Sequence, residues 1–240
     1  MIKLTIDGKK VAAEEGGTIL DAANQAGIRI PTLCSHESLR PAGACRVCTV
    51  EIATNGAKSL TTACDYPVEA GLKVSTTSEK VMEARRLAVE LLLAQRPHSS
   101  KLQELARKLG VKQPRFVLAE QECILCQLCV RTCQEIVDVE AITFVAQGKD
   151  RGVAEPTVVH SLDKCIGCDA CAYVCPTESI TVTDIGDTRT INTPSGKLEF
   201  KLKQCQVCGK YWAPEKQLDY IIEKWHLEPE LFATCPDCRD

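Results

Sequence analysis

The 240-residue chain lacks the features that define several large functional classes. It has no long apolar run, because the longest, LAVELLLA at 87–94, is far shorter than a membrane span and contains Glu90. Its 29 basic and 32 acidic residues leave a net charge of −3, which gives no case for binding nucleic acid or a membrane surface. The opening residues MIKLTIDGKK contain no apolar signal core. We therefore expect a soluble, cytoplasmic protein that binds no nucleic acid and does not insert into a membrane.

Motifs that mark catalytic and nucleotide sites are also missing. No G-x-G-x-x-G follows a strand pattern, and no phosphate-binding G-x4-G-K-S/T, nucleophile elbow or H-E-x-x-H motif is present. Aromatic residues make up only 4% of the chain, which indicates a small core. We expect no catalytic residues, and no enzyme activity of this chain by itself.

Cysteine, by contrast, is abundant. The sixteen cysteines fall into four groups of four with no remainder, and four ligands are what an iron-sulfur cluster or a structural zinc requires. Because no secretion signal accompanies them, we interpret them as metal ligands and not as disulfides. The four groups are Cys34, Cys45, Cys48, Cys64; Cys123, Cys126, Cys129, Cys133; Cys165, Cys168, Cys171, Cys175; and Cys205, Cys208, Cys235, Cys238.

The second and third groups carry the most specific spacing. Both CILCQLCVRTC and CIGCDACAYVCP follow C-x2-C-x2-C-x3-C, in which three cysteines bind one [4Fe-4S] cluster and the fourth binds the other cluster. Zinc is the alternative for any cysteine quartet, but two interlocked quartets at this spacing disfavour it. The predicted ligand sets are therefore Cys123, Cys126, Cys129 and Cys175 for one cluster, and Cys165, Cys168, Cys171 and Cys133 for the other.

The first group lies on a segment with the strand and helix order of a β-grasp fold. Residues 2–13 alternate around a DG turn, and a helix begins after the capping residue Thr18 and ends at Gly27. A second hairpin over 46–63, with an Asn-Gly turn, and a strand over 72–76 complete the pattern. This scaffold favours a [2Fe-2S] cluster held by Cys34, Cys45, Cys48 and Cys64, with structural zinc as the alternative.

Residues 78–118 contain no cysteine and predict a helical connector. A first helix is expected over 78–95, and a second follows with Ser99 or Ser100 as its cap and Gly110 as its end. The apolar positions expected to form one face of the first helix are 81, 84, 88, 91 and 92.

The last group consists of two C-x2-C pairs, CQVC and CPDC, which have the form of two zinc knuckles. A predicted helix between them has Leu218, Ile221, Ile222 and Trp225 on its inner face. We favour a zinc ion bound by Cys205, Cys208, Cys235 and Cys238, with a further iron-sulfur cluster as the alternative.

These predictions give an α+β protein in four parts. The parts are a β-grasp [2Fe-2S] ferredoxin domain at 1–77, the helical connector at 78–118, a bacterial-type two-[4Fe-4S] ferredoxin domain at 119–185, and a C-terminal zinc-ribbon-like metal-binding segment at 186–240.

The segments CSHESLRPAGACRVCTVE, RFVLAEQECILCQLCVRTCQEI and DKCIGCDACAYVCPTESI carry a family resemblance. Residues 1–185 resemble the N-terminal iron-sulfur module shared by the largest peripheral-arm subunit of complex I, the diaphorase small subunit of NAD-reducing hydrogenases, and electron-bifurcating [FeFe]-hydrogenases. Those relatives usually hold one more [4Fe-4S] cluster through a histidine and three cysteines. Here the matching stretch, AQRPHSSKLQELARKLGV, contains no cysteine, so we expect His98 to be an ordinary surface residue.

The resemblance implies an electron-transfer subunit of a soluble multisubunit oxidoreductase. Its expected partners are a flavin- and NAD(P)-binding subunit that oxidises NAD(P)H, and a catalytic or ferredoxin-facing subunit with a hydrogenase, formate dehydrogenase or ferredoxin site. The alternative is an iron-sulfur redox-sensing regulatory protein. Such a regulator is expected to show a basic face or a DNA-binding helix pair, and neither is evident.

Overall fold

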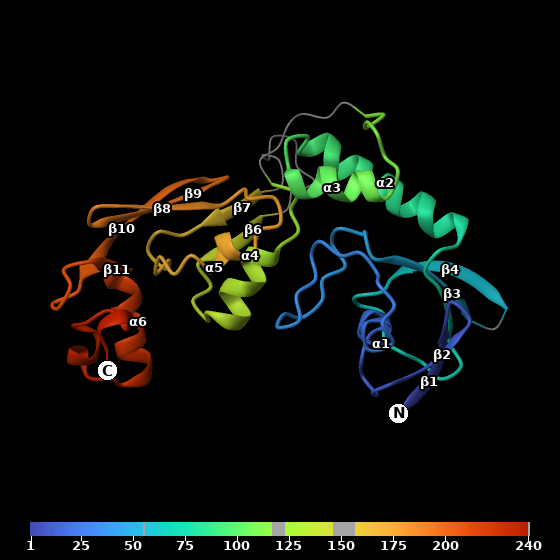
Figure 1. Cartoon of the computed structure of the whole chain (residues 1–240), viewed down its shortest axis with the longest axis horizontal. Coiled ribbons are helices and arrows are strands. Elements are labelled where there is room, and N and C mark those ends of the chain that lie inside the picture. Colours follow the sequence, from blue (N-terminus) through green and yellow to red (C-terminus); the bar gives the residue numbers. More distant parts are fainter. Residues whose placement is uncertain (55, 117–122, 146–156, 240) are drawn as a thin grey trace. The chain divides into compact units, whose positions relative to one another are not determined.

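The structure is a computed structural model that describes residues 1–54, 56–116, 123–145 and 157–239. The chain falls into two compact units, Met1–Gln127 and Leu128–Asp240, and each has its own sheets and helices (Figure 1). The α+β class predicted from the sequence is confirmed. The four-part domain division stays a prediction, and its boundary at 118–119 lies outside the described residues.

The first unit is built on a five-stranded mixed sheet in the order β2-β1-β5-β3-β4. The β1 strand pairs antiparallel with β2 and parallel with β5, while β3 pairs antiparallel with both β5 and β4. With one helix against the sheet, this is the predicted β-grasp arrangement. The bounds are β1 Ile2–Ile6, β2 Lys9–Ala13, α1 Ile19–Gln25, β3 Thr49–Thr54, β4 Ala57–Thr62 and β5 Lys73–Ser75. The predicted Asn-Gly turn includes residue 55, which lies outside the described residues.

Local sequence determines where α1 begins and which face it buries. The Thr18 hydroxyl accepts the Asp21 backbone N–H at 3.2 Å, and the Asp21 carboxylate accepts the Thr18 N–H at 2.9 Å, so the two residues form a capping box. Ile19, Leu20, Ala22 and Ala23 of the helix are buried in the core beneath the sheet. The core includes Cys48 and Cys64, so two predicted cluster ligands are part of the packed interior.

Two helices follow the sheet, α2 (Glu79–Gln95) and α3 (Ser100–Lys108). Both begin at serine caps, because the Ser78 and Ser99 hydroxyls each accept a backbone N–H from the first turn. Ser99, one of the two predicted caps, is therefore the cap of α3. Gly110 follows α3 with φ +75°, which fits its predicted role as the helix stop.

The buried face of α2 differs from the prediction. Leu91, expected on the inner face, is exposed, and the buried positions recur every four residues as Val81, Arg85, Val89 and Leu93. The apolar pattern was misleading because two polar residues, Arg85 and Glu90, occupy buried positions. Both have partners outside the helix, which a periodicity argument does not consider.

Glu90 joins α2 to the segment after α3. The Arg115 guanidinium donates from Nε to Oε1 and from Nη2 to Oε2 of Glu90, both at 2.8 Å, and the Arg115 backbone N–H also donates to Oε1. These hydrogen bonds from Arg115 hold the pKa of Glu90 below its ordinary value. A buried carboxylate on α2 is thereby neutralised and fixes the path of the chain beyond the helices.

The second unit contains a two-stranded sheet and a four-stranded antiparallel sheet in the order β11-β10-β9-β8. Short helical segments carry the cysteine motifs, and one longer helix lies between the last two cysteine pairs. The bounds are α4 Leu128–Arg131 with a π-helical turn Thr132–Ile136, β6 Ile142–Val145, β7 Thr157–His160, α5 Ala170–Tyr173, β8 Thr181–Ile185, β9 Thr188–Thr193, β10 Gly196–Gln204, β11 Tyr211–Pro214, α6 Glu215–Trp225, and two single 3-10 turns, Pro229–Phe232 and Pro236–Cys238.

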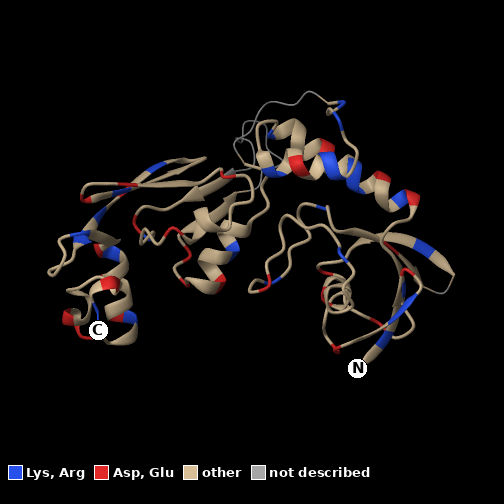
Figure 2. Ribbon diagram, in the orientation of Figure 1, with Lys and Arg blue, Asp and Glu red and all other residues tan. Residues whose placement is uncertain are grey.

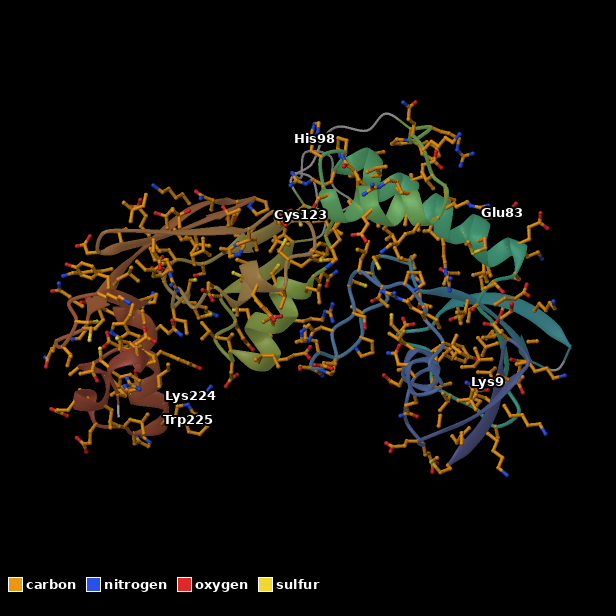
Figure 3. All side chains as sticks on the ribbon, viewed as in Figure 1. Lys9, Glu83, His98, Cys123, Lys224 and Trp225 are labelled. Atoms are coloured by element: carbon orange, nitrogen blue, oxygen red, sulfur yellow. The ribbon has the colours of Figure 1, made fainter. Side chains whose placement is uncertain are left out.

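The four-stranded sheet connects the dicluster motifs to the C-terminal segment. Strand β8, which the sequence placed in the ferredoxin domain, pairs with β9 through the register Thr181↔Asn192 to Ile185↔Thr188. Strand β10 continues directly into Cys205. One prediction for α6 is wrong: Leu218 is buried, but Trp225 is 66% exposed and lies beside Lys224 at the helix end (Figure 3).

Among the described residues, no helix has both the length and the apolar character needed to cross a membrane.

Candidate metal centres

The first quartet lies in the interior of the β-grasp unit. Cys34, Cys45, Cys48 and Cys64 are all at least nine-tenths buried, three of them in or next to loops and Cys64 after β4. The hydrogen bond that Cys45 makes with Cys34 raises the pKa of the Cys45 thiol, and a hydrogen bond from Cys64 lowers the pKa of Cys48 to about 7. The four sulfurs thus approach as two pairs, 34 with 45 and 48 with 64. Two pairs of thiols fit two iron atoms with two protein ligands each.

Gly43 allows the loop before Cys45 to pass close to β4. It has φ +58°, and a Cβ at this position would collide with the Asp65 carboxylate and lie 3.3 Å from the Thr62 hydroxyl oxygen. Asp65 accepts a hydrogen bond from Thr62, so its carboxylate is held in place. The loop that carries Cys45 is therefore packed against the residue that follows Cys64.

One cavity in the second unit is lined by Cys133, Cys165, Cys168 and Cys171. The cavity is small, with a volume of about 20 Å³, and its remaining walls are mostly apolar. Burial raises the pKa of Cys171 to about 12, and the neighbouring Cys168, Cys165 and Cys133 act in the same direction. Thiols in such a place become thiolates only when a metal centre supplies positive charge. Cys133 thus lies at the same cavity as the later motif, and the crossed ligand assignment itself stays a prediction.

The two cubane motifs share a backbone conformation. In the first motif, Leu125 and Gln127 have φ +55° and +59°, and at the equivalent positions of the second motif Gly167 and Asp169 have +76° and +62°. Left-handed residues turn successive backbone N–H groups toward one side of a loop. The Leu125 N–H accordingly donates to Cys123 Sγ at 3.3 Å. Leucine at a position that favours glycine is strained by roughly 1–2 kcal/mol, so this conformation was not predictable from the residue type.

Backbone amides also reach sulfur in the other motifs. Ala141 N–H donates to Cys133 Sγ at 3.3 Å, Ser179 N–H to Cys175 Sγ at 3.2 Å, and Cys45 N–H to Cys34 Sγ at 3.4 Å. Hydrogen bonds to ligand sulfur are among the factors that determine the reduction potential of an iron-sulfur cluster. The remaining quartet, Cys123, Cys126, Cys129 and Cys175, includes residues of both units, so its joint ligation stays a prediction from the sequence.

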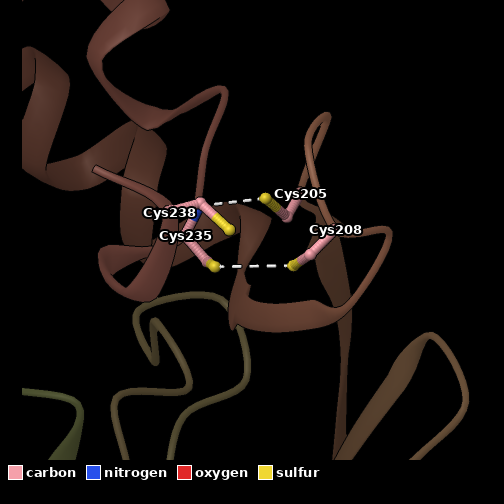
Figure 4. A group of neighbouring side chains, drawn as sticks. All are labelled: Cys205, Cys208, Cys235 and Cys238. Carbon is pink, nitrogen blue, oxygen red and sulfur yellow. Dashed lines mark hydrogen bonds between the residues drawn. The ribbon is translucent and has the colours of Figure 1, made fainter. Parts of the chain in front are cut away.

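The C-terminal quartet is compact enough for one metal ion. The sulfur atoms of Cys205, Cys208, Cys235 and Cys238 all lie within 4.8 Å of one another (Figure 4). Cys208 Sγ and Cys235 Sγ are 3.7 Å apart, close to the separation of about 3.8 Å that follows from four metal–sulfur bonds of about 2.3 Å in a tetrahedron. Cluster ligands bind different iron atoms and must be spaced more widely, so this geometry fits a mononuclear site.

Cys205, the first ligand of this quartet, has a lowered thiol pKa that suits it to bind a cation. The Cys235 N–H donates to Cys205 Sγ at 3.3 Å, and backbone hydrogen bonds, first that from Cys208, lower the pKa of Cys205 to about 6. Burial raises the pKa of Cys235. Cys205 and Cys235 are buried while Cys208 is exposed, so the site lies at the protein surface.

Helix α6 fastens this C-terminal site to the cluster-binding loops of the same unit. Lys216 Nζ donates to the carbonyls of Leu162 and Asp163 at 2.9 and 2.7 Å, just before the third cysteine motif. From the next turns, the Tyr220 hydroxyl donates to the Asp138 carbonyl at 3.0 Å, and Lys224 pairs with the Asp138 carboxylate at 2.8 Å. The helix thereby contacts segments adjacent in sequence to Val137 and Cys165, which line the cavity of Cys133.

Gly167 provides a second link between the cavity and the C-terminal segment. A Cβ at this position would lie 2.8 Å from Phe200 Cγ and 3.0 Å from Pro214 Cγ. Its carbonyl accepts a hydrogen bond from Arg189 Nη1 at 3.1 Å, and Arg189 is held by two 2.9 Å hydrogen bonds to Asp184. The loop of the third motif is thus packed directly onto β9, β10 and β11, a contact that sequence analysis did not predict.

His98 is exposed near the start of α3, as expected for a surface residue (Figure 3). No cysteine of the described chain is present between Cys64 and Cys123 to form the extra site of the relatives.

Comparison with known protein families gives two matches. Residues 1–79 match the 2Fe-2S iron-sulfur cluster binding domain, and residues 122–179 match the 4Fe-4S dicluster domain. Both matched ranges end before Cys205, so they assign nothing to the last quartet.

Curated relatives are subunits of oxidoreductase complexes. The chain is 38% identical over 174 residues to NADPH-Fe(3+) oxidoreductase subunit alpha of Geobacter sulfurreducens, covering 62% of this chain and 20% of that protein. It is 33% identical over 180 residues to an NADH-quinone oxidoreductase subunit of Rhizobium meliloti, covering 64% and 21%. It is 33% identical over 178 residues to the HndD subunit of the NADP-reducing hydrogenase of Solidesulfovibrio fructosivorans, covering 62% and 30%. The matches therefore span less than a third of the length of these relatives.

A solved structure of NAD+-reducing [NiFe]-hydrogenase in the H2-reduced state contains a similar chain. The TM-score is 0.55 at 31% sequence identity, and the match covers 61% of this chain and 71% of the hydrogenase chain. The matched part of this chain therefore shares its fold with the hydrogenase chain.

Proposed function

Because this chain belongs to the family of iron-sulfur subunits that join a 2Fe-2S domain to a 4Fe-4S dicluster domain, we propose that it carries electrons within a larger oxidoreductase complex. Its partners would be a flavin- and NAD(P)-binding subunit and a subunit with a hydrogenase, formate dehydrogenase or ferredoxin-facing site. We propose a cytoplasmic complex. The redox-sensing alternative is not favoured, because the relatives are named as oxidoreductase and hydrogenase subunits.

One observation carries this proposal: Cys133 joins Cys165, Cys168 and Cys171 at a single apolar cavity. A [4Fe-4S] cluster with four protein thiolates has no open iron position for substrate, so its chemistry is electron transfer. Bound clusters would supply one-electron oxidation and reduction. The chain itself holds them through thiolates, donates backbone N–H groups to the sulfurs, and excludes water by burial. We propose on this basis that the chain is not catalytic by itself.

The complete ligand assignment gives one [2Fe-2S] cluster, two [4Fe-4S] clusters and one zinc ion. The [2Fe-2S] ligands would be Cys34, Cys45, Cys48 and Cys64, and the zinc ligands Cys205, Cys208, Cys235 and Cys238. The short sulfur–sulfur separations of the last set support a single ion over a further cluster. Zinc is favoured for this ion because two paired C-x2-C turns at a surface site are typical of structural zinc.

The test is iron and zinc analysis of anaerobically purified chain, followed by potentiometric electron paramagnetic resonance. About ten iron atoms and one zinc per chain are expected from this cluster count, with a single [2Fe-2S] signal and interacting [4Fe-4S] signals on reduction. Catalytic oxidation of NAD(P)H by the isolated chain would contradict the non-catalytic role. About eleven irons without zinc would show that the last quartet holds a single iron ion, and about twelve to fourteen would show that it holds a further cluster.

A further inference from the structure

A second cavity lies in the first unit, next to the loop that leads into Cys34. It has a volume of about 450 Å³, is open on one side to solvent, and is lined by the loop before Cys34, by α2 and by the length of α3. This volume is in the range of small-molecule binding sites. Ile30, Leu33, Met82, Leu105 and Leu109 provide its apolar walls.

The polar groups of this cavity are predominantly positive. Its lining includes Arg29, Arg85 and, from the two ends of α3, Lys101 and Lys108. Glu104 is the one carboxylate in the wall, and it is paired with Lys108 at 2.5 Å. Figure 2 shows basic residues on both α2 and α3. The cavity wall therefore carries an excess of about three positive charges in a chain whose net charge is −3.

Arg85 is the buried member of this group. Its side chain is 4% exposed, and its Nε donates to the Thr49 carbonyl at 2.8 Å. Among the described residues, no hydrogen-bond acceptor contacts its buried Nη2. Burial lowers the pKa of this guanidinium, opposed by negative charge at Cys48 and Asp7. A buried donor of a charged group without an acceptor is costly, so an acceptor in the adjoining cavity would remove this penalty.

We propose that this cavity binds a small anionic molecule whose phosphate or carboxylate group accepts a hydrogen bond from Arg85 and is flanked by the ammonium groups of Lys101 and Lys108. The apolar walls suit a ligand with a compact hydrophobic or aromatic body attached to the charged group. A concave site with a buried guanidinium favours a small molecule over the flexible acidic segment of a partner protein.

Binding at this site would act on the neighbouring cluster site. Arg85 is fixed to the carbonyl of Thr49, and Thr49 directly follows Cys48. An anion at Arg85 would offset the positive charge beside Cys48. It would thereby lower the reduction potential of the [2Fe-2S] cluster that Cys48 is proposed to bind. This consequence rests on the proposed [2Fe-2S] site, whereas the binding itself does not.

The test is isothermal titration calorimetry of the anaerobic holoprotein at low salt. The probes are inorganic phosphate and adenosine 5′-monophosphate, with adenosine as the uncharged control. The variant Lys101→Gln/Lys108→Gln removes two exposed cations from the wall, and Lys80→Gln/Lys112→Gln removes two exposed cations elsewhere in the same unit. Because Arg85 is buried and its replacement can disturb folding, Arg85→Lys serves only as a supporting variant.

The expected result is saturable binding of adenosine 5′-monophosphate that weakens at least tenfold in the cavity variant and is unchanged in the control variant. Added ligand would also shift the [2Fe-2S] potential to lower values in wild type and not in the cavity variant. Equal binding of adenosine, or equal affinity of both double variants, would overturn the proposal. Absence of binding by every probe, with Lys101 protected from acetylation only in an assembled complex, would assign the site to a partner's carboxylate instead.

Iron content and cluster spectra separate this inference from the proposed function. Anion binding with unexpected cluster content would refute the function and retain the site. The expected cluster content without anion binding would refute the anion site and leave the proposed function intact.

Discussion

The substitution Gly167→Ala gives a direct test of how the third cysteine motif depends on the C-terminal sheet. A methyl group at this position would lie 2.8 Å from Phe200 Cγ and 3.0 Å from Pro214 Cγ, closer than carbon atoms normally approach. Both neighbours are buried, so relief requires movement of strands or of the loop. We expect about 1–3 kcal/mol from overpacking and roughly 1–2 kcal/mol from the left-handed backbone, a loss of about 2–5 kcal/mol in total.

The assay is loss of visible iron-sulfur absorbance in guanidinium under anaerobic conditions, with iron counted before the titration. Gly186→Ala is the matched control, because Gly186 has φ +59° and no atom within 4 Å of an added Cβ. It isolates backbone strain, so its midpoint should fall less than that of Gly167→Ala. The double variant Gly167→Ala/Phe200→Leu should recover part of the loss through a coupling of about 1–3 kcal/mol. Equal midpoints for the two alanine variants would refute the packing argument.

Three further substitutions test contacts in both units. Gly43→Ala should remove the [2Fe-2S] signal while leaving the [4Fe-4S] signals, because the added methyl group would displace the Cys45 loop; Gly71→Ala, with open space around it, is the control, and a normal [2Fe-2S] spectrum in Gly43→Ala would contradict the expectation. Glu90→Gln should lower the melting temperature at pH 7, because it removes the charge that pairs with Arg115. Because Arg115 lowers the pKa of Glu90, the higher melting temperature of wild type should be fully present at pH values above 4.5, the ordinary pKa of the carboxyl group. It should be lost as the pH falls through the lower pKa of the folded state. A melting-temperature difference that is independent of pH would argue against the ion pair. Tyr220→Phe should destabilise the second unit by about 1 kcal/mol, measured as earlier loss of [4Fe-4S] absorbance in guanidinium, and an unchanged midpoint would show that the hydrogen bond from Tyr220 does not support the cluster loops.

Sequence analysis succeeded where structure depends on neighbouring residues. The start of α1 follows from Thr18 and Asp21, which are three residues apart and cap each other. The cysteine spacing also predicts that Cys133 binds a cluster together with the later motif; these residues line one cavity, and their shared ligation stays a prediction. Ligand spacing is a local property, because a short loop must present several sulfurs to one centre.

Prediction failed where the deciding partner lies far away in the sequence. The buried face of α2 contains Arg85 and Glu90, whose side chains hydrogen-bond to Thr49 and Arg115, 36 and 25 residues away. A second reason is length: strands β7 and β11 were not predicted, because four residues are too few for an alternating apolar pattern to be recognised. Leu125 is in a left-handed conformation that residue type disfavours, and the metal-binding loop around it gives the reason.

The C-terminal quartet is best understood through what α6 contacts. The helix lies between Cys208 and Cys235 in the sequence, so a metal ion that joins the two C-x2-C pairs closes a loop around it. That loop fixes both ends of the helix that presents Lys216 and Tyr220 to the segments beside the cluster cavity. Whether the ion is zinc or iron, the closure has the same mechanical effect, because the chain geometry and not the redox state restrains α6. A small segment gains folding stability from such a metal site, and here the gain would extend to the loops that hold Cys133 and Cys165.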